Sequence, residues 1–131
     1  MRLHSFPTRR SSDLTVDVPA VPAGVVADET PGESSAAVRR RVVAARQAHQ
    51  HRRGDGGPSV NAAMTRREVA RWCRPDEEGR VLLYRAAERF GLSARACDRV
   101  LKVARTLADL TASPDVRAEH VAEALQYRVV E

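Results

Sequence analysis

The longest amphipathic pattern in the chain lies between residues 92 and 110. Apolar side chains recur there every three or four positions, as one face of an α-helix requires. Gly91 suits a left-handed residue that ends the preceding helix, and Ser93 can accept a hydrogen bond from a free backbone N–H of the next one. The sequence therefore predicts a helix of four or more turns. Its apolar face comprises Cys97, Val100, Leu101, Ala104, Leu107 and Ala108.

A serine at position 34 or 35 can begin an earlier helix that runs to about residue 52. Its predicted apolar face holds Val38, Val42 and Ala45, and arginines surround the other faces. Such a basic helix can follow a phosphate backbone, but arginine also shields the apolar side of an ordinary solvated helix. We favour the second interpretation because only one side of the helix is apolar. The histidines near its end, His49 and His51, have no carboxylates nearby, so no metal site is expected.

Two further helices follow from signals at their starts, and a third from its apolar residues. Thr65 and Glu68 have the spacing of a capping box and predict a short helix ending near Cys73. Pro75 and the three acidic residues after it predict a helix start, where the helix dipole explains the acidic cluster better than catalysis does. A last helix is expected from 117 to about 127. The predicted inward residues of these last two helices are Leu82, Leu83, Ala86, Ala87 and Phe90, and Val121, Ala124 and Leu125.

Four or five helices with short connections predict an all-α bundle over residues 34–131. Residues 15–22 alternate apolar and polar positions, which predicts one strand without a partner, and 23–33 contain linker residues such as Gly24 and Pro31. Residues 1–14 differ in composition from the rest, and 5–14 resemble a translated sequencing adapter. We expect residues 1–14 to be an unstructured artefact and the remainder to be a fragment, so that the gene upstream of codon 15 encodes further sequence.

Composition limits the function classes. A chain of 131 residues with 4% aromatic content predicts one small core of Ala, Val and Leu, and the Ala, Val and Arg bias suggests a GC-rich bacterial genome. The 22 basic and 17 acidic residues are interleaved, which makes a weak electrostatic case for nucleic-acid binding by this chain alone. Cys73 and Cys97 are expected to be buried thiols in a reducing cytosol. No run is apolar enough to cross a membrane, so we expect a cytoplasmic protein.

No motif for nucleotide hydrolysis occurs in the sequence. The glycines between 54 and 57 could form a loop, but a Walker A loop requires a lysine before its Ser or Thr. Lys102 is the only lysine in the chain. We therefore expect the chain alone to be inactive towards ATP, with no catalytic residue and no metal ligand of its own.

The runs at 91–95 (GLSAR) and 99–110 (RVLKVARTLADL) resemble the C-terminal domain of the magnesium-chelatase-like AAA+ ATPases of the YifB/ComM type. The likeness extends to 61–64 (NAAM) and 119–128 (EHVAEALQYR), and it covers most of residues 34–131. This resemblance implies that 34–131 form the helical lid of such an ATPase. Residues 15–33 would then be a remnant strand and a linker from a missing AAA+ core.

The resemblance also implies a site. In that family the arginine at the start of the lid's penultimate long helix is the sensor 2 residue, which corresponds to Arg95 here. A guanidinium stays charged and binds phosphate oxygens bidentately, so it suits the sensing of bound ATP. Arg99 and Arg105 are weaker candidates, for subunit contacts or for salt bridges within the lid. The family further implies ATP and Mg²⁺ held by the missing core, a homo-hexamer in which the lid contacts a neighbouring subunit, and a parent that acts on DNA.

Two other functions stay open. A small basic DNA-binding module would need Arg and Asn at base-reading spacing on one helix, whereas the arginines here are spread over every helix. A protein-interaction bundle without a ligand is the other alternative. The environment of Arg95 distinguishes this interaction bundle from the lid, because a sensor arginine must be exposed at the helix start and not held in a salt bridge.

Overall fold

The computed structural model describes residues 14–54 and 60–128. Within these ranges it contains helices and turns but no strand, which confirms the predicted all-α class. The elements are the α-helices α1 (Ala23–Val26), α2 (Ser35–Arg53), α3 (Arg66–Trp72), α4 (Glu77–Phe90), α5 (Ala94–Leu110) and α6 (Ala118–Gln126), and the 3₁₀ turn η1 (Asn61–Ala63).

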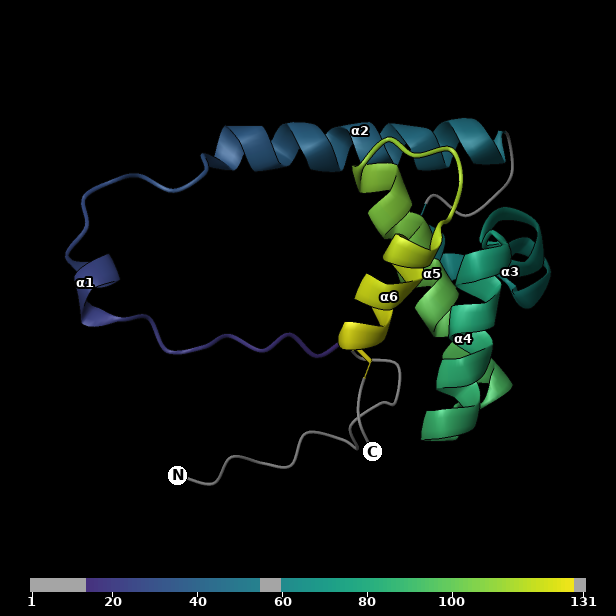
Figure 1. Cartoon of the computed structure of the whole chain (residues 1–131). Coiled ribbons are helices and arrows are strands. Elements are labelled where there is room, and N and C mark those ends of the chain that lie inside the picture. Colours follow the sequence, from purple (N-terminus) through teal and green to yellow (C-terminus); the bar gives the residue numbers. More distant parts are fainter. Residues whose placement is uncertain (1–13, 55–59, 129–131) are drawn as a thin grey trace, which may run out of the picture.

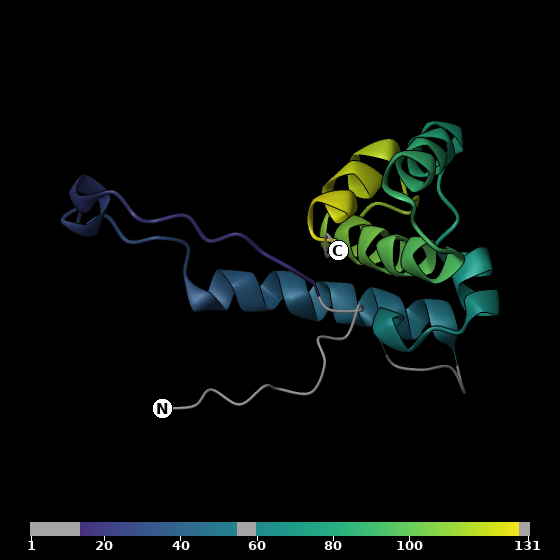
Figure 2. The ribbon, with the colours of Figure 1, turned by 90° about the horizontal axis from the view of Figure 1, so that it is seen from below.

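Helix α5 lies in the middle of the bundle. It contacts α2, η1, α3 and α6, and α6 also packs on α4. Figure 2 shows α2 along one side of α5, with α4 and α6 on the other side. In Figure 1 the first half of α2 extends beyond the bundle, towards α1. Two faces of α5 are therefore covered, not only the one that its apolar pattern predicts.

The helix ends follow the predicted capping residues. The hydroxyl oxygens of Ser34 and Ser93 accept hydrogen bonds from the N–H groups of the third residue after each, at 3.1 Å. Thr65 and Glu68 form the reciprocal capping box. Gly91 has φ 65°, the left-handed conformation that ends α4 at little cost only for glycine. These local signals were sufficient to place the helix boundaries.

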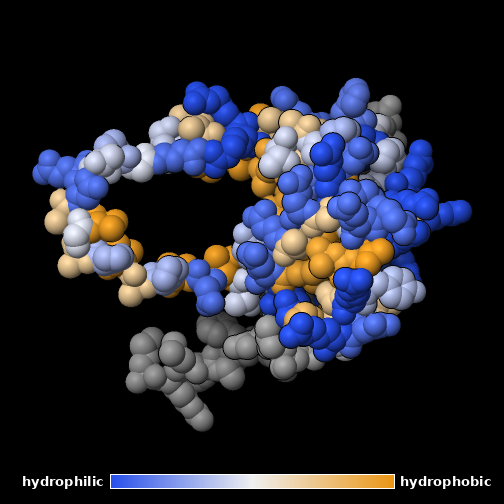
Figure 3. Space-filling view, viewed as in Figure 1, coloured by the Kyte–Doolittle hydropathy of each residue, from blue (hydrophilic) through white to orange (hydrophobic). Residues whose placement is uncertain are grey.

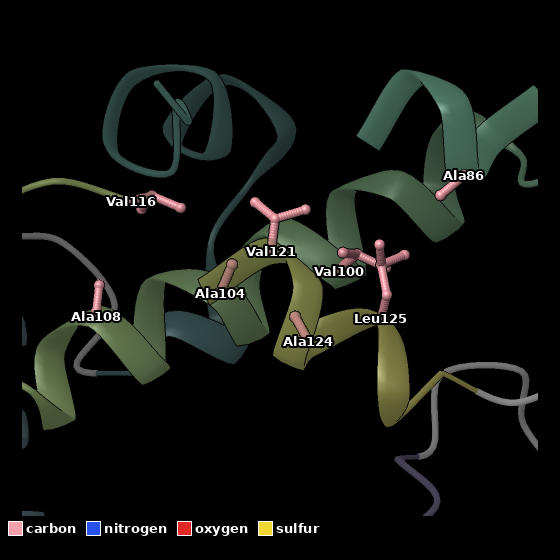
Figure 4. Packing of buried hydrophobic residues seen from close by; sticks show 8 residues of the cluster. All are labelled: Ala86, Val100, Ala104, Ala108, Val116, Val121, Ala124 and Leu125. Atoms are coloured by element: carbon pink, nitrogen blue, oxygen red, sulfur yellow. The ribbon is translucent and has the colours of Figure 1, made fainter. Parts of the chain in front are cut away.

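The main core joins α5 to α6 and is built from small side chains. Figure 4 shows residues of α5 facing residues of α6, with Ala86 of α4 beside them. Phe90 was predicted to be buried, but it is 49% exposed. The guanidinium of Arg128 lies 3.8 Å from the centre of its ring, so the ring is covered by a cation and not by the core. The buried cluster comprises Ala86, Val100, Ala104, Ala108, Val116, Val121, Ala124 and Leu125.

Residues 14–34 form an N-terminal arm that leaves the bundle and returns to the start of α2 (Figure 1). The predicted strand does not form: residues 14–22 have no regular structure, because no second strand is available to pair with them. The short helix α1 occupies part of the predicted linker. The backbone N–H of Thr15 donates to the carbonyl of Tyr127 at 2.9 Å, which joins the arm to the end of α6. The adapter-like segment, apart from Leu14, lies outside the described residues.

The arm and the first half of α2 expose apolar side chains. On the face seen in Figure 3, hydrophobic residues lie along the arm, and the bundle is hydrophilic around one hydrophobic patch. Of the predicted apolar face of α2, Ala45 is buried but Val38 and Val42 are 39% and 44% exposed. The face is therefore covered only where α2 lies on α5. The exposed valines of the arm and of α2 are Val16, Val18, Val21, Val25, Val26, Val38, Val42 and Val43.

Candidate functional site

Arg95 is the second residue of α5, two positions after the capping serine. Its side chain is exposed. No hydrogen bond or ion pair joins it to any residue within 14–54 or 60–128. The guanidinium is therefore presented to solvent from the first turn of the central helix, and not held in a salt bridge.

The position of Arg95 is unfavourable for the helix itself. The first turn of an α-helix carries a partial positive charge, so a cation there costs roughly 0.3–1 kcal/mol. No acidic residue lies in the first turn of α5 to offset this charge. Arg95 thus adds charge to an end that already attracts anions through its free N–H groups. The arrangement favours the binding of a negatively charged group such as phosphate.

The other two candidate arginines are in different surroundings. Arg99, one turn further along α5, is partly buried and has an interaction partner. Arg105 is only 4% exposed, so its side chain is buried inside this domain. Its guanidinium donates to the carbonyls of Ser113 at 2.8 Å and Pro114 at 3.1 Å. The structure therefore does not gather the three arginines into one site.

A buried polar cluster, which the sequence analysis did not predict, surrounds Asp109. Arg52 of α2 donates to both carboxylate oxygens, at 3.0 and 2.7 Å, and Arg105 donates from Nε at 3.2 Å. The amide of Asn61 donates at 3.1 Å, and Nε2 of His49 lies 2.7 Å from Oδ2. Because a carboxylate only accepts, this geometry requires the hydrogen of His49 on Nε2. The cluster fixes α2 and η1 against α5.

Two ionisation equilibria are shifted in this cluster. Burial alone raises the pKa of Asp109, but the hydrogen bonds from Arg52 and Asn61 and the charge of Arg105 outweigh it and hold the pKa below its usual value. Burial lowers the pKa of His49, against the opposing charge of Asp109. Asp109 is therefore ionised and His49 neutral at neutral pH. One pair in the sequence could have indicated part of the cluster, since Arg105 and Asp109 stand four residues apart on one helix.

The cysteines and histidines do not form a metal centre among the described residues, where no group of three His, Cys, Asp or Glu side chains could hold an ion. Cys73 is fully buried, with its sulfur 3.4 Å from that of Met64. Burial raises the pKa of Cys73 to about 11, so its thiol is unreactive at neutral pH. Cys97 is only partly buried. In the described part of the chain, none of the helices has the length and apolarity needed to span a bilayer.

Comparison with known proteins places this arrangement in a family. A profile of the family described as "Magnesium chelatase, subunit ChlI C-terminal" matches residues 32–128. The chain is 37% identical over 119 residues to the competence protein ComM of Haemophilus influenzae, and 37% identical over 120 residues to the uncharacterized protein YifB of Escherichia coli. The matched parts are 90% and 91% of this chain but 23% of each relative. The chain therefore belongs to the magnesium chelatase C-terminal domain family, in the form that ComM and YifB contain.

Proposed function

We propose that this chain is the nucleotide-sensing lid of a magnesium-chelatase-like AAA+ ATPase, with Arg95 as its sensor 2 arginine. The observation that carries the proposal is the exposed guanidinium, without a partner in the described residues, in the first turn of α5. There it can bind the terminal phosphate of ATP held by the core of its own or a neighbouring subunit. Loss of that phosphate on hydrolysis would remove the contact, and the rigid helix α5 would transmit the change to the rest of the lid.

The exposed valines support a lid that packs on a larger protein. Many exposed apolar side chains on one part of a domain commonly mark an interface. The N-terminal arm and the first half of α2 expose eight valines, which is unfavourable for a domain surrounded by water. Since the chain spans 23% of the length of its curated relatives, the remaining part of such a parent is the natural partner for this surface.

ATP and Mg²⁺ would be held mainly by the rest of the parent. Among the described residues no carboxylate cluster could bind Mg²⁺, and the sequence has no phosphate-binding loop with a lysine. Arg95 can supply one contact to a phosphate, which is sufficient for sensing but not for catalysis. On the basis of the resemblance to ComM-type proteins, we extend the proposal to the parent protein. It would form a homo-hexamer in the cytoplasm and act on DNA.

The sensing role can be tested by nucleotide binding to the intact parent. Arg95→Gln should weaken the binding of a non-hydrolysable ATP analogue by about tenfold or more, because a charge-assisted bond to the terminal phosphate is lost. The affinity for ADP, which lacks that phosphate, should change by no more than about twofold. Both affinities can be measured by calorimetry.

Arg67→Gln is the matched control for this experiment. Arg67 is the second residue of α3, as Arg95 is of α5, and its side chain is also exposed. The Arg67→Gln variant should bind the ATP analogue and ADP within about twofold of the wild type, since most surface substitutions have small effects. Equal losses of ATP and ADP affinity in Arg95→Gln would contradict a sensor of the terminal phosphate.

The chain by itself should not hydrolyse ATP or bind it with micromolar affinity. One guanidinium provides a small part of the binding energy that a phosphate loop and a bound metal provide together. Calorimetry and a phosphate-release assay on the purified chain would check this expectation. Micromolar affinity for ATP in the isolated chain would contradict its assignment as a lid.

A further inference from the structure

A second positively charged region lies at the other end of α5, in a pocket of about 550 Å³. The walls come from the end of α2, the end of α3 and the connection between α5 and α6. Pockets of this volume are typical of sites for small ligands. Arg95 does not line it. The lining combines charged residues, among them Arg52, Arg71, Arg74, Arg105 and Asp109, with apolar ones such as Ala48, Trp72 and Val116.

The charges of the pocket favour an anion. Four arginines and two aspartates line it, which leaves an excess of two positive charges. Arg105 and Arg52 are bound to Asp109, whereas Arg71 and Arg74 are exposed and form no ion pair with any residue that the structure describes. Two guanidiniums are thus available to a ligand. Their attraction is stronger in a concave site than on an open surface, because the low-dielectric walls focus the field.

An unsatisfied donor also belongs to this pocket. The Nε of Arg52 is buried without a hydrogen-bond partner among the described residues, although its two terminal nitrogens bind Asp109. Buried donors in folded proteins almost always have a partner, and an exception calls for an explanation. Arg52, which lines the pocket, is therefore an arginine with one donor unpaired in the described part of the chain, although that atom itself is enclosed.

The apolar part of the lining restricts the ligand further. The guanidinium of Arg71 lies over the Trp72 ring, 4.5 Å from its centre, so this wall presents an aromatic ring with a cation stacked on one face. A phosphate accepts several hydrogen bonds from guanidiniums, and a nucleobase can pack on aromatic and apolar walls. A free inorganic anion would leave the apolar walls without contact.

We propose that this arginine pocket binds the phosphate of a nucleotide, with its base against the Trp72 wall. The nucleotide can be free or part of a single strand of nucleic acid, since both present the same phosphate and base. This site goes beyond the proposed sensing of ATP and does not depend on Arg95. Its contacts would place a nucleotide where α2, α3 and the connection after α5 meet, and so would couple ligand binding to the packing of the lid.

The test uses the full chain and its single tryptophan. The indole N–H of Trp72 gives one resonance in a ¹H–¹⁵N correlation spectrum, which can be followed while thymidine monophosphate or a hexamer of thymidylate is added at constant ionic strength. We expect a saturable shift with a millimolar dissociation constant for the mononucleotide. If the hexamer binds about tenfold more tightly than the mononucleotide, the ligand is a single strand. If the two bind equally, the ligand is a free nucleotide. No saturable shift with either ligand would overturn the proposal.

Substitutions then assign the binding to the pocket. The double variant Arg71→Gln/Arg74→Gln should weaken binding by about tenfold or more, because it removes both available guanidiniums. Arg39→Gln/Arg40→Gln removes the same charge from exposed positions of α2 outside the pocket and should have an effect of no more than about twofold. The dispersion of the spectra confirms folding of each variant. Wild-type affinity in the Arg71/Arg74 double variant would refute the site.

Discussion

Arg95→Ala in the intact parent should lower ATP turnover by on the order of 10³-fold while the lid remains folded. Arginines that stabilise a transferring phosphoryl group contribute 10³ or more in rate, and we expect a comparable loss from a sensor arginine that contacts the terminal phosphate. Folding should be unaffected because the side chain is exposed and forms no hydrogen bond or ion pair with the described part of the domain. The helix should even gain slightly, since a cation is removed from its positive end. Steady-state ATPase assays with circular dichroism as the folding control measure both effects.

Two variants make this prediction specific. Arg95→Lys should restore little turnover, because an ammonium lacks the bidentate fork of a guanidinium. Arg67→Ala removes an exposed arginine from the same position of α3 and should change turnover by no more than about twofold. If Arg67→Ala abolished turnover and Arg95→Ala did not, Arg95 would not be the sensor.

The sequence predicted those parts of the fold that depend on neighbours along the chain. The capping residues Ser34, Thr65 and Ser93 act within a few positions, and the structure confirms each of them. Val100, Ala104 and Ala108 are buried as the helical period predicts. The exposure of Arg95 also follows from its place off the apolar stripe. The sensing role proposed for it, by contrast, comes from the family resemblance, because one exposed arginine has no chemical pattern of its own.

The failures occurred where distant segments determine the environment. The buried polar cluster joins α2, η1 and α5, and no local pattern shows that Arg52 and Asn61 approach Asp109. Arg105 was a candidate for subunit contacts or for salt bridges within the lid, and in the structure it forms an ion pair with Asp109 inside the domain. Its burial also depends on residues distant from any local pattern, because its guanidinium binds two backbone carbonyls in the connection after α5, while α2 and η1 cover α5 on a second side. The helical period of apolar residues indicates one buried face of α5, and the second face is covered through polar side chains that this period does not include.

The buried polar cluster leads to the largest expected effect on stability. Asp109→Asn should destabilise the domain by roughly 3–5 kcal/mol, because it leaves the buried guanidiniums of Arg52 and Arg105 without a counter-charge. All three side chains are at most 13% exposed, so water can screen little of the loss. Small domains have a total stability of about 5–15 kcal/mol. We therefore expect the melting temperature to fall by about 12 °C or more, or the chain to unfold at room temperature.

Two measurements distinguish the destabilisation by Asp109→Asn from a general loss of charge: its pH dependence, and a control variant that breaks an exposed ion pair. The pKa of Asp109 is lowered in the folded state, so its stabilisation is present above the usual carboxyl pKa of about 4 and is lost as the pH falls through the folded-state value. The free energy of unfolding, measured with urea, should therefore differ strongly between the wild type and Asp109→Asn at pH 7, and this difference should shrink at acidic pH. Glu33→Gln breaks the exposed pair with Arg41 and should cost at most about 1 kcal/mol at pH 7. A midpoint for Asp109→Asn equal to that of Glu33→Gln at pH 7 would show that the buried polar cluster does not hold α2 against α5.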